Sequence, residues 1–296
     1  MPCIWAAELG NTGDTKVATI KSYLTSPRSY CVDLGLDSEH IAIFDHPRLQ
    51  RIVRGIKIFH AAREAAQVRE RLPITNDILL RLLETLDQRP HRGKTLYAAF
   101  CLAFAAFLRI GEFTWGAHQW ASGDLDFASW HATRRSITLG FNNSDGHHLD
   151  RLFFTLPASK TDPFRQGVTI TIAAADERAC AVSVLHLLLT RWPSPPESPL
   201  FTLHHHELGQ NPTAFDRRIV VNELRGCLTS AGISGGYSGH SFRRGAATSA
   251  RMAGVADHDI QLLGRWRSDA YKRYIEVHPE YIYNVSRRFQ LHSTTP

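Results

Sequence analysis

Four residues from three separate parts of the sequence have the chemistry to attack a phosphodiester bond without a metal ion. Arg109 closes a long apolar run, His240 and Arg243 stand three residues apart, and Tyr274 follows them. Arginine guanidiniums bind phosphate oxygens in pairs and offset the charge that a phosphate gains in the transition state. A histidine donates a hydrogen bond to that phosphate or moves a proton, and a tyrosine oxygen is a nucleophile. The order and spacing of these residues together predict one active site.

Each of these residues also has a more ordinary interpretation. A tyrosine such as Tyr274 is most often a half-buried core residue whose hydroxyl is hydrogen-bonded. The spacing predicts that Ser268 caps a short helix on which Tyr271 and Tyr274 fall on adjacent turns. Arg109 needs a partner at the end of an apolar helix, and Glu112 is available. Arg109 is therefore either half of an ion pair or a phosphate clamp that Glu112 orients.

The surroundings of His240 and Lys160 allow similar alternatives. A helix that begins directly after His240 would aim His240 and Arg243 in one direction. The glycine-rich segment 234–239 leads into this helix start, and the free amides of helix N-termini bind anions. Lys160 falls in a predicted hairpin loop, where a lysine is normally only solvated. Its functional interpretation is a mobile general acid that protonates the leaving 5′ oxygen.

The distribution of charge favours a nucleic-acid partner. The chain has 296 residues, a formal net charge of +6 and a pI of about 9.2. Residues 217–288 contain twelve lysines and arginines against six acidic residues, so this segment has a surplus equal to that of the whole chain. A basic face beside a phosphate site is typical of proteins that bind nucleic acid. An ordinary solvated surface explains the charge alone equally well.

The sequence argues against several other classes of protein. It has no P-loop of the GxxxxGK[ST] form, so we expect no nucleotide partner. His204, His205 and His206 are adjacent, which is a poor geometry for one tetrahedral metal ion, so we expect no metal and no other cofactor. The five cysteines are scattered without a CxxC pair, as is typical of a reducing, intracellular compartment. The longest apolar run, 96–108, is too short to span a membrane, so we expect no membrane partner.

Hydrophobic spacing predicts a mainly α-helical chain with one small antiparallel β-sheet, an α+β fold. Residues 1–72 are predicted to form a helical domain in which Pro27 ends or kinks the first helix, a second amphipathic stripe covers 49–59, and a linker follows over 63–71. Residues 73–296 form the second predicted domain. In it we expect a helix from residue 75 or 76, a buried helix from 96 to 109–111, strands at 136–139, 153–156 and 168–172, a helix around 184–188, and helices near 213–230, 241–253, 257–263, 268–276 and 280–290.

Taken together, these residues resemble the tyrosine recombinase (phage integrase) family, and the resemblance covers nearly the whole chain. Five motifs in the family's order carry it: Leu108-Arg109-Ile110-Gly111-Glu112-Phe113 for the first arginine, Ser159-Lys160-Thr161-Asp162 for the hairpin lysine, Gly239-His240-Ser241-Phe242-Arg243 for the HxxR box, Leu263-Gly264-Arg265-Trp266 for the second-histidine region, and Tyr274 for the nucleophile. The segment 264–274 is similar to recombinases of eukaryotic mobile elements, the Crypton and DIRS-like groups, especially those of fungi.

The resemblance implies a set of site residues, a mechanism and partners. The catalytic residues would be Arg109, Lys160, His240, Arg243, Trp266 and Tyr274, supported by Glu112 and Arg265, with DNA contacts from Lys21, Arg28, Arg54 and Arg244. Tyr274 would attack the scissile phosphate to give a 3′-phosphotyrosine and a free 5′ hydroxyl, without a metal or a high-energy cofactor. The partner would be double-stranded DNA, bound at two sites by a homotetramer that exchanges C-terminal helices, here near 281–289, between its subunits.

The sequence departs from the family pattern at two places. Nine residues before Tyr274 the family has His or Trp and this chain has Arg265; we assign that role to Trp266, and the register stays open. The segment 71–75 resembles the start of the catalytic domain, and 1–72 resembles the helical DNA clamp but is short enough to lack its first helix. Two alternatives to an active recombinase therefore stay open. They are a DNA-binding protein without catalysis and a type IB topoisomerase.

Overall fold

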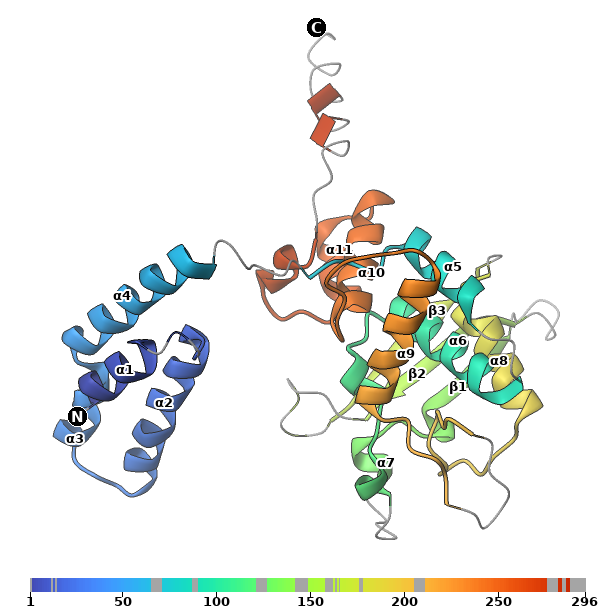
Figure 1. The fold of residues 1–296 in the computed structure, drawn as a ribbon. Coiled ribbons are helices and arrows are strands. Elements are labelled where there is room, and N and C mark those ends of the chain that lie inside the picture. Colours follow the sequence, from blue (N-terminus) through green and yellow to red (C-terminus); the bar gives the residue numbers. More distant parts are fainter. Residues whose placement is uncertain are drawn as a thin grey trace, which may run out of the picture. The chain divides into compact units, whose positions relative to one another are not determined.

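The computed structural model of this protein describes residues 2–11, 13, 15–64, 71–86, 90–120, 127–141, 149–157, 162, 164, 166–175, 178–204, 211–275, 282–283 and 286–287. The chain divides into two compact units, Met1–Arg69 and Glu70–Pro296, and each is considered by itself (Figure 1). In the described residues the regular elements are helices and one three-stranded antiparallel sheet. The predicted fold class is therefore confirmed.

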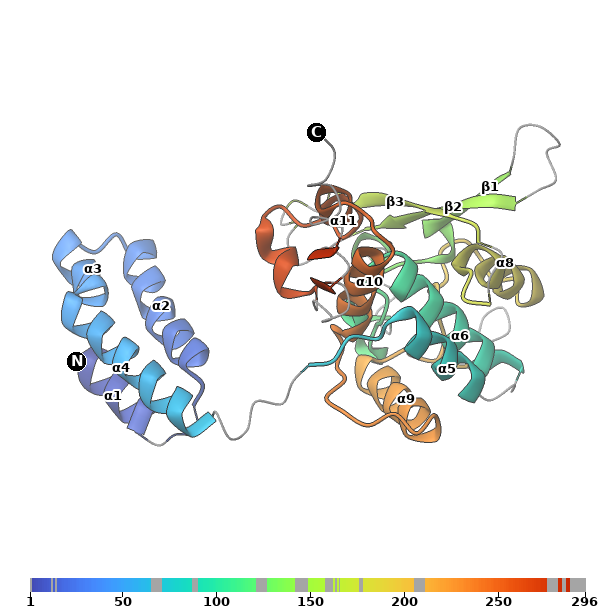
Figure 2. The same cartoon turned by 90° about the horizontal axis from the view of Figure 1, so that it is seen from above.

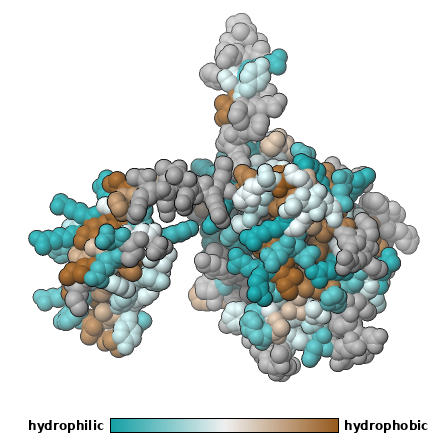
Figure 3. Space-filling view, in the orientation of Figure 1, coloured by the Kyte–Doolittle hydropathy of each residue, from teal (hydrophilic) through white to brown (hydrophobic). Residues whose placement is uncertain are grey.

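The N-terminal unit consists of helices around a small apolar core. They are α1 (Pro2–Asn11), α2 (Val17–Asp33), α3 (Ser38–Asp45) and α4 (Pro47–Glu64) (Figure 2). Ile20 and Leu24 of α2 meet Leu49 and Val53 of α4 in this core, together with Ala6 of α1. A spacing of four residues places each pair on one face of its helix. Some apolar side chains also reach the surface of this small unit (brown in Figure 3).

Two boundaries in this unit differ from the prediction. Pro27 was predicted to end or kink the first helix, and it does not end it, because α2 continues to Asp33. Pro27 removes one backbone hydrogen bond from the helix, but the apolar contacts of Ile20 and Leu24 hold the turns before it against the core. The linker was predicted from residue 63, whereas α4 continues to Glu64.

The second unit is built around one buried helix. Its elements in chain order are α5 (Asn76–Thr85), α6 (Pro90–Ala105), η1 (Ile110–Glu112), η2 (Ala117–Gln119), α7 (Phe127–Trp130), η3 (Arg134–Ser136), β1 (Ile137–Phe141), β2 (Leu149–Leu156), β3 (Val168–Ala173), α8 (Ala181–Arg191), α9 (Arg217–Ser230), α10 (Ser241–Met252), α11 (Asp257–Leu263) and η4 (Asp269–Arg273), where η denotes a 3-10 helix. Residues 98–103 of α6 are fully buried because α5, α8 and α10 pack around them. The apolar run that predicted a buried helix is thus the centre of the core.

The sheet has the strand order β1-β2-β3, and both strand pairs are antiparallel (Figure 2). Leu152 pairs with Ile172 and Phe154 with Ile170, and these alternate residues are buried in the core. Helix α8 packs against β2 and β3. All three predicted strands are present, and β2 begins earlier than predicted, at Leu149.

One helix boundary changes the setting of the predicted active site. The sequence predicts a buried helix that ends at 109–111, but α6 ends at Ala105. Phe107 then has a φ of 52°, a left-handed conformation that interrupts a helix. Arg109 follows in extended backbone, directly before η1. Arg109 therefore belongs to a turn and not to the end of the helix.

The length and hydrophobicity of the helices bear on whether the chain could cross a membrane. No single helix in the described part of the chain is long and apolar enough to cross a membrane. One pair of helices, His91–Ala105 and Ile110–Gln119, is long and apolar enough when taken together, but the two are bent by 108°. The first helix of this pair belongs to α6, the buried centre of the unit.

The predicted helix near 280–290 lies outside the described residues, except at 282–283 and 286–287.

Candidate active site

The turn after α6 is the point at which the predicted site assembles. The backbone N–H of Ile110 donates to the carbonyl of Gly239, the residue before His240, at 3.0 Å. Arg243, the third residue of α10, donates through Nη1 to the carbonyl of Phe107 at 2.8 Å. The HxxR box at the start of α10 is therefore tied to the segment that carries Arg109.

Glu112 joins two arginines of this site. Its carboxylate accepts a hydrogen bond from the backbone N–H of Arg109 at 2.9 Å and from Arg109 Nη1 at 2.8 Å. Arg265 Nη2 lies 3.6 Å from Oε2 of the same carboxylate, which is 8% exposed. The ion pair that the sequence offered for Arg109 is present. It is compatible with a phosphate clamp, because a guanidinium has five N–H donors and Glu112 occupies only one of those of Arg109.

Arg243 is buried, with 2% of its surface exposed. Besides the Phe107 carbonyl, it donates to the carbonyl of Gly264 through Nη2, and its Nε has no hydrogen-bond partner among the described residues. Burial, together with the nearby charge of Arg109, lowers the pKa of Arg243 to about 10. Arg243 is therefore still a cation at neutral pH, and a bound phosphate would offset the cost of its burial.

Trp266 contacts both Arg243 and Tyr274. The guanidinium carbon of Arg243 lies 4.3 Å from the indole centroid, and the Tyr274 ring centroid lies 5.5 Å from it. Arg265 adopts a φ of 56° before it, and Gly264 leaves room for the indole, because a Cβ there would overlap the ring. Trp266 Nε1 is buried and has no hydrogen-bond partner in the described part of the chain. This N–H is therefore a buried donor that no described residue satisfies.

Tyr274 and His240 line one open pocket of about 390 Å³, with Arg71, Ser238, Ser241, Arg244 and Ala270. As predicted, Ser268 caps the helix that leads to Tyr274: its hydroxyl accepts from the N–H of Ala270 at 3.4 Å. This helix is the 3-10 helix η4, and Tyr274 is the residue that ends it.

The two tyrosines of this segment have different surroundings. Tyr271 is 4% exposed, and its hydroxyl donates to Asp257 at 3.3 Å. Tyr274 is half-buried and lines the pocket, and no described residue forms a hydrogen bond with its hydroxyl. Of the two, Tyr274 is the one whose hydroxyl can meet a ligand.

His240 lies immediately before α10, amid positive charge. Burial lowers the pKa of His240 below its ordinary value of 6.5, and the charges of Arg109, Arg71, Arg217 and Arg243 lower it further. Its Nδ1 is buried without a hydrogen-bond partner among the described residues. The imidazole is therefore mainly neutral at pH 7, when it can donate one proton in a hydrogen bond and accept another.

The other predicted residues are spread over the two units. Lys160 lies outside the described residues, so its place is not given by the structure. Arg244 lines the Tyr274 pocket and donates through Nη1 to the carbonyl of Arg71 at 2.8 Å. In the N-terminal unit, Lys21, Arg28 and Arg54 line one pocket of about 570 Å³. Their convergence was not predicted from their spacing.

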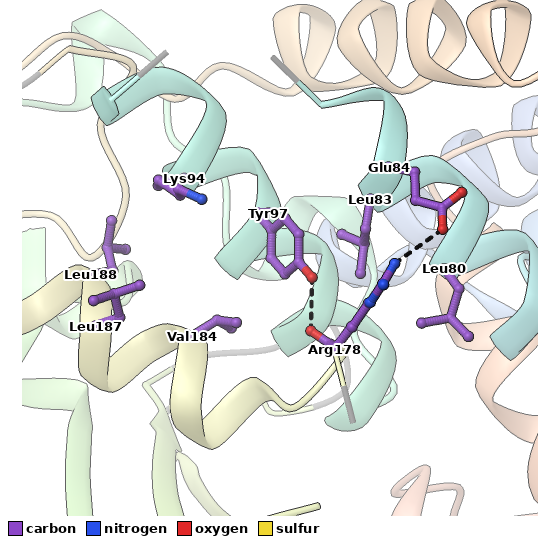
Figure 4. Close-up of a pocket in the computed structure, with 9 residues that line it drawn as sticks. All are labelled: Leu80, Leu83, Glu84, Lys94, Tyr97, Arg178, Val184, Leu187 and Leu188. Carbon is purple, nitrogen blue, oxygen red and sulfur yellow. Dashed lines mark hydrogen bonds and ion pairs between the residues drawn. The ribbon is translucent and has the colours of Figure 1, made fainter. Parts of the chain in front are cut away.

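Two other features of the second unit, a second pocket and the histidine run, lie apart from the predicted site residues described above. A pocket of about 460 Å³ between α5, α6 and α8 is lined by four leucines together with valine, tyrosine and charged side chains (Figure 4). In it Tyr97 donates to the Arg178 carbonyl at 2.8 Å, and Arg178 is paired with Glu84 at 3.3 Å. None of the predicted site residues that the structure describes line it. Of the histidine run, only His204 is described, and the described residues contain no group of His, Cys, Asp or Glu arranged for a metal ion.

Two arginines beside His240 were not identified from the sequence. Arg71 lines the Tyr274 pocket, and the charges of both Arg71 and Arg217 act on His240. Arg71 lies in the segment that resembles the start of a catalytic domain, and Arg217 lies in the basic segment 217–288. Neither stands at a motif spacing from His240, because tertiary contacts bring them together. The local surplus of positive charge was the one sequence signal for Arg217.

Comparison with known proteins reveals a shared fold. No protein-family model and no curated protein sequence matches this chain. The XerH site-specific recombinase bound to a palindromic difH substrate, in a post-cleavage complex, is similar with a TM-score of 0.50 and 12% identity, over 75% of this chain and 54% of that one. The XerA recombinase has a TM-score of 0.48 and 14% identity, over 95% of this chain and 86% of that chain. A lambda integrase dimer bound to a COC′ core site has a TM-score of 0.46 and 16% identity, over 89% of this chain and 65% of that chain.

The likeness to XerH is one of fold. The chain shares with the XerH site-specific recombinase a mainly helical fold with a small antiparallel sheet. It spans about half the length of the XerH chain. An identity of 12% does not carry residue roles from one protein to the other, so the roles of the site residues depend on the geometry described above.

Proposed function

We propose that this protein breaks and rejoins double-stranded DNA as a site-specific recombinase of the tyrosine type. One observation carries the proposal: Tyr274 and His240 line the same pocket, beside the buried Arg243 and the Arg109–Glu112 pair. A tyrosine hydroxyl, a neutral imidazole and two guanidiniums are the groups that metal-free phosphoryl transfer requires. The fold supports the proposal, because XerH, which shares it, is a site-specific recombinase.

In the proposed reaction the Tyr274 hydroxyl attacks the scissile phosphorus. A bond forms between the tyrosine oxygen and phosphorus, and the bond from phosphorus to the 5′ oxygen breaks. The tyrosine proton passes to the neutral imidazole of His240, and Lys160 protonates the leaving 5′ oxygen. Arg109, Arg243 and the N–H of Trp266 stabilise the charge on the phosphate oxygens. A second 5′ hydroxyl reverses these steps on a partner strand, and the phosphotyrosine retains the bond energy for that step.

The proposed partners follow from the same assignment. Double-stranded DNA would contact Lys21, Arg28 and Arg54 of the N-terminal unit, which would act as a helical clamp, and Arg244 beside the active-site pocket. A homotetramer on two DNA sites is proposed from the sequence resemblance. The narrower assignment to mobile-element recombinases of the Crypton and DIRS-like groups also rests on that resemblance, over residues 264–274.

Covalent trapping of DNA tests the proposed function. The full chain is incubated with fragments of the DNA that flanks its own gene and denatured in SDS, and the protein-linked DNA is sequenced. The matched variants are Tyr274→Phe and Tyr271→Phe, which remove one hydroxyl each from neighbouring tyrosines. We expect adducts with the wild type and with Tyr271→Phe, and none with Tyr274→Phe.

The same experiment separates the alternatives. Adducts that persist in Tyr274→Phe and vanish in Tyr271→Phe would move the nucleophile to Tyr271. Salt-sensitive DNA binding by the folded wild type without any adduct would leave a DNA-binding protein without catalysis. Adducts with relaxation of supercoiled DNA, but without joined products from two sites, would identify a topoisomerase.

A further inference from the structure

The segment that enters the second unit runs directly into the candidate active site. The backbone N–H of Leu72 donates to the carbonyl of Gly236 at 3.2 Å, and that of Ile74 donates to the carbonyl of Ser241 at 3.0 Å. The Ile74 carbonyl lies against Gly245 of α10 so closely that a Cβ on Gly245 would overlap it. Residues 72–74 are therefore fixed on the start of α10, which also carries the HxxR box.

Arg71 is the residue that this anchoring brings to the pocket. Its carbonyl accepts a hydrogen bond from Arg244 Nη1 at 2.8 Å, and its side chain lines the pocket with His240 and Tyr274. The side chain is exposed, and no described residue forms an ion pair with its guanidinium. Arg71 thus presents a cation at the pocket that contains the proposed nucleophile.

Arg71 differs in one respect from the arginines already assigned to the site. Arg109 is bound to Glu112, and Arg243 donates to two backbone carbonyls, so both belong to one hydrogen-bonded arrangement around the turn after α6. Arg71 belongs to a separate segment and shares the pocket with Arg244. A DNA strand has one phosphate per about 3.4 Å of helix axis, so a strand whose attacked phosphate lies at Tyr274 brings its next phosphates to the rim of the same pocket.

We propose that Arg71 is a further phosphate-binding residue of this site, and that it holds a backbone phosphate next to the one that Tyr274 attacks. The proposal rests on the proposed function and names a contact that the recombinase motifs do not include. An arginine fork binds two phosphate oxygens at once, so this contact would also fix the strand in register with the nucleophile.

The salt dependence of DNA binding tests the proposal. Binding to a fluorescent duplex of mixed sequence is measured over a series of salt concentrations in a Tyr274→Phe background, in which no covalent step interferes. Each phosphate contact contributes about 0.9 to the slope of log K against log salt. We expect Arg71→Gln to lower that slope by about 0.9 and the affinity at low salt on the order of tenfold. Arg71→Lys, which keeps the charge, should retain the slope.

Arg178→Gln is the matched control, because it removes an exposed arginine of the same unit that pairs with Glu84 and does not line the Tyr274 pocket. Its slope should equal that of the parent. An Arg71→Gln variant with the parental slope and an unchanged melting temperature would overturn the proposal. A lowered slope for Arg71→Gln, together with no adduct from the chain that keeps Tyr274 in the trapping experiment, would keep the phosphate contact and refute the cleavage, so the two proposals fail separately.

Discussion

The guanidinium carbon of Arg243 lies 4.3 Å from the centroid of the Trp266 indole, in a cation–π contact between two sequence motifs. The same indole lies 5.5 Å from the ring of Tyr274. Trp266 therefore joins Arg243, which is proposed to bind phosphate, to the proposed nucleophile. This contact also bears on the register that the sequence left open, because Trp266 and not Arg265 lies between these two residues.

Replacing Trp266 with Phe tests whether its N–H contacts the phosphate. The ring remains over Arg243, whereas the buried and unpartnered Nε1 is lost. We expect the rate of covalent attachment to fall on the order of a hundredfold with DNA binding retained, as when one oxyanion donor is removed. Trp266→Ala, by contrast, should lower the free energy of unfolding by about 3 kcal/mol or more, since it empties a buried site. A full cleavage rate in Trp266→Phe would return the role to Arg265.

Glu112→Gln should destabilise the fold and disturb Arg109. The Glu112 carboxylate is 8% exposed and faces both Arg109 and Arg265, so its neutralisation leaves two guanidiniums without their countercharge. We expect a loss of about 3 kcal/mol in the free energy of unfolding, measured by chemical denaturation. Glu84→Gln is the control, because its ion pair with Arg178 is exposed and contributes less than about 1 kcal/mol. Equal effects of the two variants would contradict the central place of Glu112.

His240 should make stability depend on pH below neutrality. Its pKa in the folded protein lies below the ordinary value of 6.5, because burial and neighbouring arginines disfavour the imidazolium. As the pH falls through 6.5 the unfolded chain takes up the proton first, so the free energy of unfolding decreases until the folded-state pKa is reached. Above that window the contribution is constant. His240→Gln should show a weaker decrease over the same range in denaturation curves, whereas an unchanged pH profile would refute the lowered pKa.

Gly245 should tolerate no side chain, because a Cβ there would overlap the Ile74 carbonyl. We expect Gly245→Ala to lower the free energy of unfolding by about 3 kcal/mol or more, since backbone must move to make room. Gly226→Ala, in α9, is the matched control: nothing lies within 4 Å of its Cβ position. The free energy of unfolding of that variant should rise by about 0.5 to 1 kcal/mol, because alanine has a higher helix propensity than glycine. A mild effect at Gly245 would show that the 71–75 segment is not held against α10.

The sequence by itself determined the classes of element and the residue types of the site. Apolar spacing predicted the α5 and α6 helices, because local periodicity records which face of an element is buried, and runs of β-branched and aromatic residues predicted the three strands. The prediction failed where tertiary contacts override local signals. Helix α2 runs through Pro27, and α6 stops at Ala105 because Phe107 turns left-handed.

Only the tertiary structure decided which side chains meet. The sequence offered Glu112 as a partner for Arg109. It did not indicate that Arg265 shares the Glu112 carboxylate or that Trp266 stacks on Arg243. It gave no indication that Arg71 lies beside His240 and Tyr274. These contacts join residues from 23 to about 200 positions apart. They form because the turn after α6, the start of α10 and the turn after α11 hydrogen-bond to one another. Neither hydrophobic periodicity nor motif spacing encodes a distance across the fold.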